Sequence, residues 1–191
     1  FSSSLFFPTI VSGPITKLQK ISSDMSMVDV GINRYYEAII YISSGLFKKS
    51  IAEFSNTLIY GNELFEQSNP FLFAWIKAIA YMAKYYADFS AYSDIAIGVS
   101  KIIGVNIPLN FNLPFTATSM SDFWRRWHIS FSTFMNEYVF QPLCYSDFFI
   151  FFQKIPWLGK NLFKNRIYIS IIATMALSGL WHGFNLNFLL W

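Results

Sequence analysis

The longest apolar run in the chain extends from Ile167 to Trp191 and contains no Asp, Glu, Lys or Arg. As a helix, a run of this length would cross a hydrocarbon core of roughly 30 Å, so the pattern predicts a membrane span. Its one ionisable side chain is His182. Ionisable groups within a span are costly and mark functional positions by default.

Small and polar residues surround this histidine at helical spacing. Gly179 and Gly183 share one face, where another helix or a substrate could approach the backbone closely. Ser178 comes one turn before His182 and Asn185 just under one turn after it, which predicts a polar stripe along the helix. A structural histidine that bonds between packed helices stays open as the alternative.

Two further regions have helical apolar spacing. In residues 34–59 the pattern is interrupted by Gly45 and by Lys48 and Lys49, which predicts an amphipathic or kinked helix whose lysines reach lipid headgroups. Residues 71–104 are apolar except for one polar face, formed by Lys77, Tyr81, Lys84, Asp88 and Tyr92. Such a face turns to a cavity or a partner helix.

Two points about residues 71–104 stay open. An ion pair between Lys84 and Asp88 would hold helices together, whereas an unpaired stripe would serve as a polar path. Gly98 makes two helices with a break as reasonable as one helix ending near Gly104.

Helix-breaking residues divide the rest of the chain. Residues 1–16 contain two prolines and a glycine, which predicts a re-entrant segment or a connector. Residues 17–34 are polar and predict a loop or short surface helix. Residues 61–70 predict a loop, and residues 106–118, with two prolines and several Asn, predict an extended linker.

A short basic helix is expected after the linker. Ser119 and Asp122 have the spacing of a capping box. Residues 123–135 predict a helix that lies in the membrane interface and ends by Pro142. Its apolar face would consist of Trp124, Trp127, Phe131 and Phe134. The alternative is a simple membrane anchor with solvated arginines. Further along, the basic residues of segment 154–166 predict a cytoplasmic loop before the last span.

Composition supports a membrane protein. The chain is 54% hydrophobic and 20% aromatic but only 13% charged, against about 25% charged in soluble domains. A net charge of +3 suits an anionic lipid surface better than nucleic acid. We therefore expect an all-α, multi-span integral membrane helical bundle with interfacial and re-entrant helices. Because the chain starts without Met and stops within an apolar run, we expect it to be the core of a longer protein.

The polar residues are compatible with several chemistries. A neutral histidine can take a hydroxyl proton near pH 7, and burial keeps it neutral. Ser178 and His182 could form a nucleophile and base, but no orienting acid follows. Cys144, the lone cysteine, has no nearby base in sequence, and a metal held by His128 and His182 lacks an evident third ligand.

The sequence resembles the membrane-bound O-acyltransferases, in particular the bacterial branch that includes alginate O-acetyltransferase and the D-alanyl transfer protein of teichoic acid synthesis. The resemblance is carried in order by Phe7–Pro14, Gly45–Lys49, Asp88–Gly98, Asp122–Ser130 and Trp181–Gly183. Ala91 stands where the branch usually has Gly. The resemblance implies that residues 1–191 form a single domain, the central catalytic part of the fold of this family.

The resemblance also implies an activity. It implies acyl transfer, most naturally of acetyl, from a cytoplasmic thioester donor toward hydroxyls of an envelope polysaccharide such as an alginate-like polymer or peptidoglycan. The family's essential histidine maps to His182 and the branch's second histidine to His128, which could donate to a developing oxyanion or orient the proton partner of His182. The expected donor or acceptor contacts are Arg125, Arg126, Trp124, Trp127, Asp88, Tyr92, Ser178 and Asn185. Arginine suits the phosphates of coenzyme A or an acyl carrier, although a helix salt bridge between Asp122 and Arg126 competes.

No bound cofactor or metal is expected, only the thioester donor, acetyl-CoA or an acyl carrier, as substrate. The expected partners are the lipid bilayer, a secreted or periplasmic acetyltransferase-like protein and the polysaccharide acceptor, with no nucleic acid. The expected location is the bacterial inner membrane. The alternative function is a membrane transporter or channel subunit that uses His182 and the polar face around Lys84 and Asp88 as a polar or proton path.

Overall fold

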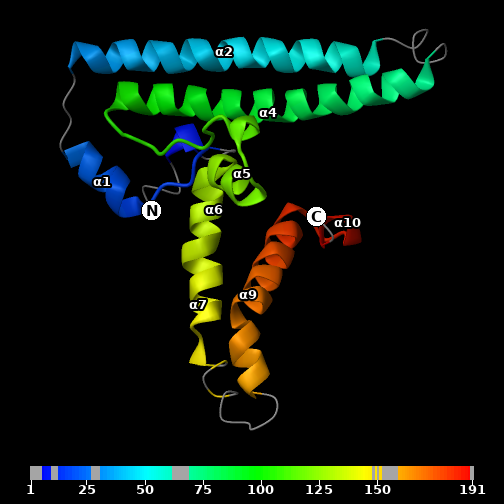
Figure 1. The fold of residues 1–191 in the computed structure, drawn as a ribbon. Helices are drawn as coiled ribbons and strands as arrows, with labels where there is room; N and C mark the ends of the chain where they lie inside the picture. Colours follow the sequence, from blue (N-terminus) through cyan, green and yellow to red (C-terminus); the bar gives the residue numbers. More distant parts are fainter. Residues whose placement is uncertain are drawn as a thin grey trace. The chain divides into compact units, whose positions relative to one another are not determined.

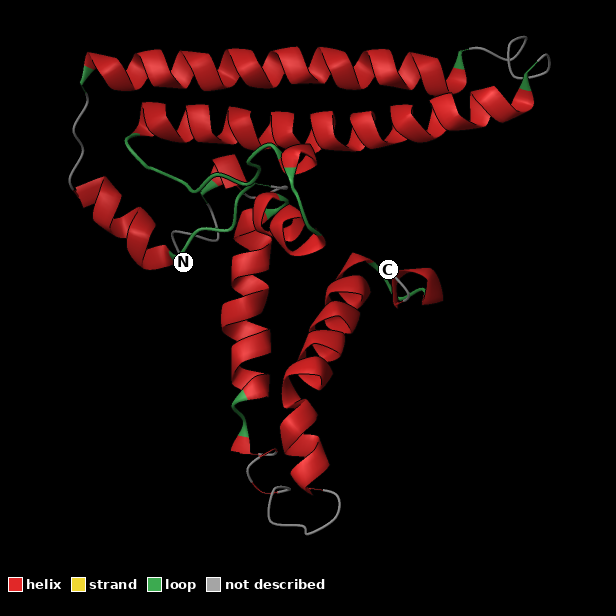
Figure 2. Cartoon of the chain, viewed as in Figure 1, coloured by secondary structure: helices red, strands yellow, loops and turns green. Residues whose placement is uncertain are grey.

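The computed structural model of the chain describes residues 6–9, 13–26, 31–61, 69–147, 149, 151 and 159–189. Within these residues the regular structure is helical and no strand occurs (Figure 2). The predicted all-α class is confirmed. None of the helices in these ranges combines the length and the apolar character that crossing a membrane requires.

The chain divides into two compact units, Phe1–Ser130 and Phe131–Trp191. The first contains η1 (Phe7–Thr9), α1 (Leu18–Ser26), α2 (Ile32–Tyr60), α4 (Pro70–Ile103), η2 (Pro114–Thr116) and α5 (Met120–Arg126). The division falls within α6 (Ile129–Met135). The second contains the π-helical turn η3 (Asn136–Phe140), α7 (Gln141–Cys144), α9 (Gly159–His182) and α10 (Leu186–Leu189). The single domain predicted for residues 1–191 stays a prediction.

Helices α2 and α4 form the framework of the first unit and lie side by side along their length (Figure 1). Small residues let their backbones come close. A Cβ atom on Gly45 would lie 2.8 Å from the carbonyl oxygen of Ala91, and one on Gly98 would lie 2.8 Å from that of Ala38. All four residues are buried. The two contacts are two helical turns apart, so they fix the register of the pair.

Both α2 and α4 are unbroken. The kink foreseen near Gly45 is absent from α2, and α4 continues through Gly98 to Gly104, whose φ of 99° gives a left-handed C-cap. Glycine at this position ends a helix without steric cost. The single-helix interpretation of residues 71–104 is therefore the correct one.

Lysines of α2 bond to acids of α4. Lys48 Nζ lies 2.6 Å from Asp94 Oδ2, which also accepts a hydrogen bond from Ser44 Oγ at 2.9 Å. Lys49 pairs with Asp88. These lysines therefore have carboxylate partners within the helix pair, and their predicted contact with lipid headgroups stays a prediction.

The ion pair between Lys84 and Asp88, one of the two alternatives for this face, does not form. Lys84 Nζ donates to Asn56 Oδ1 of α2 at 2.7 Å, while Asp88 is held by Lys49. Lys84 and Asp88 thus bond across the helix pair rather than to each other along α4. This outcome favours a structural role for the stripe over a polar path.

A small core joins the N-terminal segment and the linker to α4. Its buried members are Phe6, Ile21, Ala96, Ile97, Val105 and Ile107. Tyr92 packs against this core, half-buried. The linker after Gly104 is irregular apart from the single turn η2, as predicted. It returns along α4 and carries the chain to α5.

In the second unit, the helix predicted for residues 167–191 ends early. Helix α9 stops at His182, and Gly183, with φ of 155°, turns the chain before α10. At its other end α9 begins at Gly159, so the predicted loop is helical from that residue onward. Lys154 lies outside the described residues, and the cytoplasmic side assigned to segment 154–166 stays a prediction. Pro142 does not end the preceding helix, because it stands in the first turn of α7, where proline is tolerated.

The packing of α2 on α4 leads to a prediction for Gly45→Ala. On helix propensity alone this change would stabilise the protein by about 1 kcal/mol. We expect a loss of about 1–3 kcal/mol instead, because the new methyl group meets a backbone oxygen and the overpacked helices must separate. Thermal unfolding of the full-length protein measures the sign.

The control is Ser43→Ala, an exposed position on the same helix, which should change stability little. A rise in the melting temperature of Gly45→Ala, equal to or above that of Ser43→Ala, would contradict close packing at this point.

Candidate functional site

His128 lies in a sharp turn between two short helices. The helix predicted over residues 123–135 is interrupted, because α5 ends at Arg126 and α6 begins at Ile129. His128 has φ of 45°, a left-handed conformation that is rare for a residue with a side chain. The predicted common face of Trp124, Trp127, Phe131 and Phe134 therefore does not exist. The predicted cap is confirmed, since Ser119 Oγ accepts a hydrogen bond from Asp122 N–H at 3.1 Å.

The linker braces this turn on both sides. Asn112 N–H donates to the carbonyl of Arg126 at 2.9 Å, and Ile129 N–H donates to the carbonyl of Asn110 at 2.9 Å. A left-handed non-glycine residue costs about 1–3 kcal/mol and persists only where its surroundings hold it. The two bonds provide that support, and such strain is concentrated at functional sites.

Asn110 and Phe89 contact the ring of His128. Its Nδ1 atom lies 3.0 Å from Asn110 Oδ1. The ring of Phe89, on α4, meets it edge to face at 4.7 Å between centroids. Asn110 is buried, with 1% of its surface exposed, and its amide nitrogen donates to Ser93 Oγ of α4 at 3.2 Å. Helix α4 therefore positions His128 both directly and through Asn110.

Ser130 completes the polar cluster behind the histidine. Its backbone N–H and its hydroxyl lie 3.3 and 2.9 Å from Asn110 Oδ1. Its hydroxyl oxygen accepts a hydrogen bond from Ile15 N–H at 3.0 Å. Ser130, at the start of α6, thus links the N-terminal segment to the buried carboxamide of the linker.

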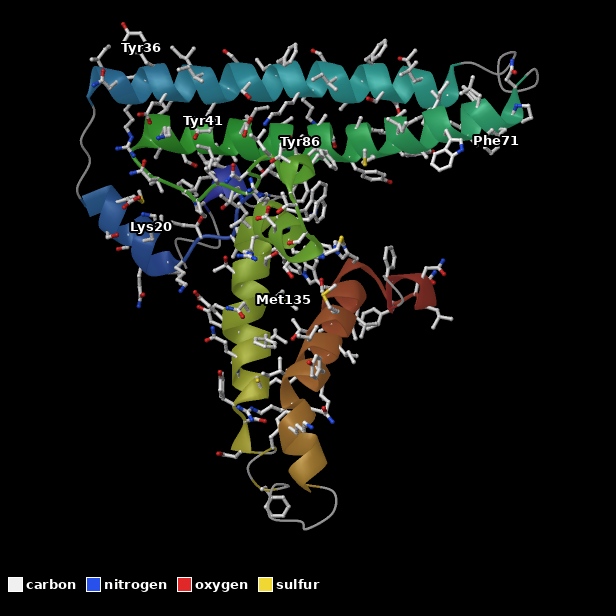
Figure 3. The ribbon with its side chains drawn as sticks, in the orientation of Figure 1. Lys20, Tyr36, Tyr41, Phe71, Tyr86 and Met135 are labelled. Atoms are coloured by element: carbon white, nitrogen blue, oxygen red, sulfur yellow. The ribbon has the colours of Figure 1, made fainter. Side chains whose placement is uncertain are left out.

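An aromatic cluster lies beside the turn and contains Trp127. Its ring stacks on Phe123, with centroids 5.6 Å apart and an angle of 16° between the planes. Phe111 and Phe115 of the linker region and Tyr86 of α4 contact the same indole, and Figure 3 labels Tyr86 on α4. Trp124 meets Phe123 edge to face at 5.5 Å. The cluster packs the linker against α4 and α5.

The two arginines have different surroundings. Arg126 Nε lies 3.0 Å from Asp122 Oδ2, which realises the competing helix salt bridge. The hydrogen bond from Arg126 lowers the pKa of Asp122 below its ordinary value, although burial opposes it. Arg125 is exposed, and its Nε donates to the carbonyl of Ser121 at 3.2 Å. Of the pair, Arg125 presents the more accessible guanidinium.

Two other predicted contacts, Asp88 and Tyr92, belong to the α4 framework. Asp88 pairs with Lys49, and Tyr92 packs against the small core. These contacts give both residues a structural role. Their predicted role in binding a substrate stays a prediction.

His182 belongs to the second unit and is the last residue of α9. Trp181 meets its ring at 5.0 Å, and Phe188 of α10 stacks on it at 6.3 Å. Trp181 in turn stacks on Phe131 at 5.0 Å. A Cβ on Gly183 would come within 2.9 Å of the Phe188 ring, so glycine permits both the turn and this packing. His182 is exposed, so the predicted burial of this residue is not found within the described residues.

The polar stripe predicted around His182 does not form. Ser178 is buried on α9, whereas Asn185 is exposed and follows the end of the helix, where its Oδ1 accepts a hydrogen bond from Asn187 N–H at 3.1 Å. A stripe requires a continuous helix, which Gly183 interrupts. The predicted contacts of Ser178 and Asn185 with a substrate stay predictions.

The other chemistries gain no support. Cys144 is buried, and no group of three His, Cys, Asp or Glu side chains suited to a metal occurs among the residues that the structure describes.

The sequence analysis did not identify Asn110, Ser93 and Phe89 as residues of the site. Phe89 and Ser93 fall inside the recognised Asp88–Gly98 motif, but Asn110 is one of three similar asparagines in the linker, and nothing local distinguishes it.

Comparison with known proteins agrees with these motifs. Residues 4–153 match the membrane-bound O-acyltransferase family. The peptidoglycan O-acetyltransferase of Helicobacter pylori is 32% identical over 97% of this chain and 33% of its own length. The probable alginate O-acetylase AlgI of Azotobacter vinelandii is 33% identical over 97% of this chain and 34% of its own length. The teichoic acid D-alanyltransferase of Bacillus subtilis is 33% identical, over 94% of this chain and 45% of its own length.

The chain therefore spans about a third of the length of the first two relatives and less than half of the third. The family match covers most of the chain, including the whole first unit from residue 4 and the His128 turn. On this evidence the chain belongs to the membrane-bound O-acyltransferase family.

Proposed function

We propose that this chain is the catalytic core of an O-acyltransferase that moves an acetyl group from a thioester donor toward hydroxyls of a cell-envelope polysaccharide. The observation that carries the proposal is His128, held in a strained turn with its ring fixed by Asn110 and Phe89. The names of the relatives support the reaction class, since each transfers an acyl or aminoacyl group or is named as an acetylase.

The proposed chemistry needs a base and a site for negative charge. A neutral histidine removes the proton from the acceptor hydroxyl as the oxygen attacks the thioester carbonyl carbon. The carbon–sulfur bond then breaks, and the thiolate recovers the proton from the imidazolium. A donor aimed at the carbonyl oxygen lowers the barrier, because charge develops there.

The two histidines are assigned separate roles. His182 is proposed as the base because it is the position to which the family's essential histidine maps. His128 is proposed to act on the proton path. Its fixed ring suits this role, since preorganised groups cost no reorganisation during the reaction.

The donor side is proposed to involve Arg125. Its guanidinium is exposed on α5, whereas Arg126 is already paired with Asp122. A coenzyme A or acyl-carrier phosphate would suit a planar guanidinium. The proposed setting is a multi-span bundle in the bacterial inner membrane, with a secreted or periplasmic acetyltransferase-like partner that reaches the polymer.

We expect His182→Gln to abolish most acyl transfer while the protein stays folded. Glutamine keeps the size and hydrogen bonding of histidine but cannot take a proton near neutral pH, so activity should fall by about 10²–10⁴, nearly as far as in His182→Ala. The measurement is acetyl transfer by purified full-length protein with its native partners, beside a thermal melt. Asn187→Ala, an exposed change on α10, serves as the control.

A structural histidine predicts the opposite order. Glutamine would then be tolerated, and alanine would lower stability by about 1–3 kcal/mol through a lost hydrogen bond. Near-parental activity of His182→Gln with an unchanged melt would remove His182 from the catalytic assignment.

We expect Arg125→Ala to weaken use of the donor more than it weakens folding. A lost hydrogen bond to a charged phosphate corresponds to about 1.5–3 kcal/mol, hence about a tenfold or larger rise in KM for the thioester. The melting temperature should hardly change, because the side chain is exposed. Lys20→Ala, an exposed cation on α1, is the control, and equal donor KM values for both variants would exclude Arg125 from donor binding.

A further inference from the structure

We infer that Asn110 is a positioning residue that fixes the tautomer of His128, so that Nε2 is the atom through which this histidine accepts and returns a proton. This inference rests on the proposed function and extends it to the residue behind the histidine. It follows from the hydrogen-bonding rules of the groups around one buried carboxamide.

The orientation of the Asn110 amide is fixed by its neighbours. The backbone N–H of Ser130 can only donate, so the group it faces at 3.3 Å must be the amide oxygen. The Ser130 hydroxyl already accepts from Ile15 N–H, and it gives its own hydrogen to the same oxygen at 2.9 Å. The amide nitrogen points the other way, to Ser93 Oγ at 3.2 Å. Rotating the amide by half a turn would set an N–H group against the backbone N–H of Ser130, which cannot accept a hydrogen bond.

The amide orientation decides the protonation of the histidine. Asn110 Oδ1 is an acceptor, so His128 Nδ1, 3.0 Å away, must carry the hydrogen. A neutral imidazole has one N–H, and its lone pair then resides on Nε2. The bond from Nδ1 to a neighbouring acceptor is the usual means by which proteins select the working nitrogen of a histidine.

The same residue also fixes where the histidine lies. The carbonyl of Asn110 accepts from Ile129 N–H, directly after the strained position, while its side chain holds the ring. With 1% of its surface exposed and α4 behind it, Asn110 has little freedom to follow a moving ring. Main chain and side chain of one residue thus define both the backbone and the ring of His128.

An amide suits this task better than a carboxylate would. A carboxylate at Nδ1 would favour the imidazolium, whereas a neutral amide holds the ring without favouring its charged form. The linker between Gly104 and Ser119 carries no ionisable side chain. The charged groups nearest in the packed elements are two acids and two exposed cations. Asp88 is paired with Lys49, and Asp122 with Arg126. Arg125 is exposed on α5, and Lys17 is exposed after the N-terminal segment that contacts Ser130.

The test is Asn110→Asp in the full-length protein with acetyl-CoA or the acylated carrier as donor. The carboxylate still accepts the Nδ1 hydrogen, so activity should persist at high pH. Its charge raises the pKa of His128, so the histidine stays protonated, and unable to accept a proton, up to a higher pH. We expect the acidic limb of the rate–pH profile to move upward by about one pH unit or more.

Asn112→Asp is the matched control, because it adds the same charge two residues away on an exposed side chain. It should leave the acidic limb in place. A purely structural Asn110 predicts that both variants keep the parental profile, whatever their melting temperatures, and that result would overturn the inference.

A second readout uses Asn110→Leu, which removes the acceptor but fills the space. We expect a loss of about 10–100-fold in the parental background, as for other residues that orient a functional histidine. In a His128→Gln background the same change should cost little further activity, because the group that Asn110 orients is gone. Equal losses in the two backgrounds would show that Asn110 acts independently of His128.

These variants separate the two proposals. Full activity of His128→Gln would overturn both the role of His128 and the inference that depends on it. An inactive His128→Gln together with an unshifted profile for Asn110→Asp would overturn only the inference.

Discussion

The close approach of α2 and α4 is the constraint on which the first unit depends. Gly45 and Gly98 leave no room for a Cβ atom against the opposite backbone, and the two contacts set the register of the helices. With that register fixed, Lys48 and Lys49 of α2 pair with Asp94 and Asp88 of α4. Bonds of this kind add little energy at a surface, but they oppose any sliding of one helix along the other.

The opposite face of α4 carries the constraint to the candidate site. Phe89 and Ser93 are one turn apart on the face away from α2, where they contact His128 and Asn110. One segment of α4 therefore has two roles. One face packs against α2, and the opposite face positions His128 and Asn110. The left-handed turn at His128 is stable because the linker bonds to the backbone on both sides of it and α4 bonds to Asn110. The N-terminal segment adds support through Ser130, which itself bonds to Asn110.

The second unit presents its histidine differently. His182 ends α9, and the chain turns at Gly183 so that Phe188 stacks on the imidazole. The spacing of Gly179 and Gly183 predicted a face for close helix packing. At Gly183 the structure shows a different reason for glycine, because a side chain there would clash with the Phe188 ring. A histidine at a helix end can be approached from beyond the terminus, which a histidine in the middle of a long span cannot.

The sequence by itself determined the helical class, the main helix regions, the Ser119 cap, the irregular linker and the family, because periodicity, capping and linear motifs are local signals. It did not determine the partners of Lys48, Lys84 and Asp88, since several pairings satisfy the same charges. It also gave no means of choosing Asn110 over its neighbours in the linker. Only tertiary structure brings residues 93, 128 and 130 to the buried amide of Asn110, and residue 15 to Ser130, because these contacts join segments far apart in the chain.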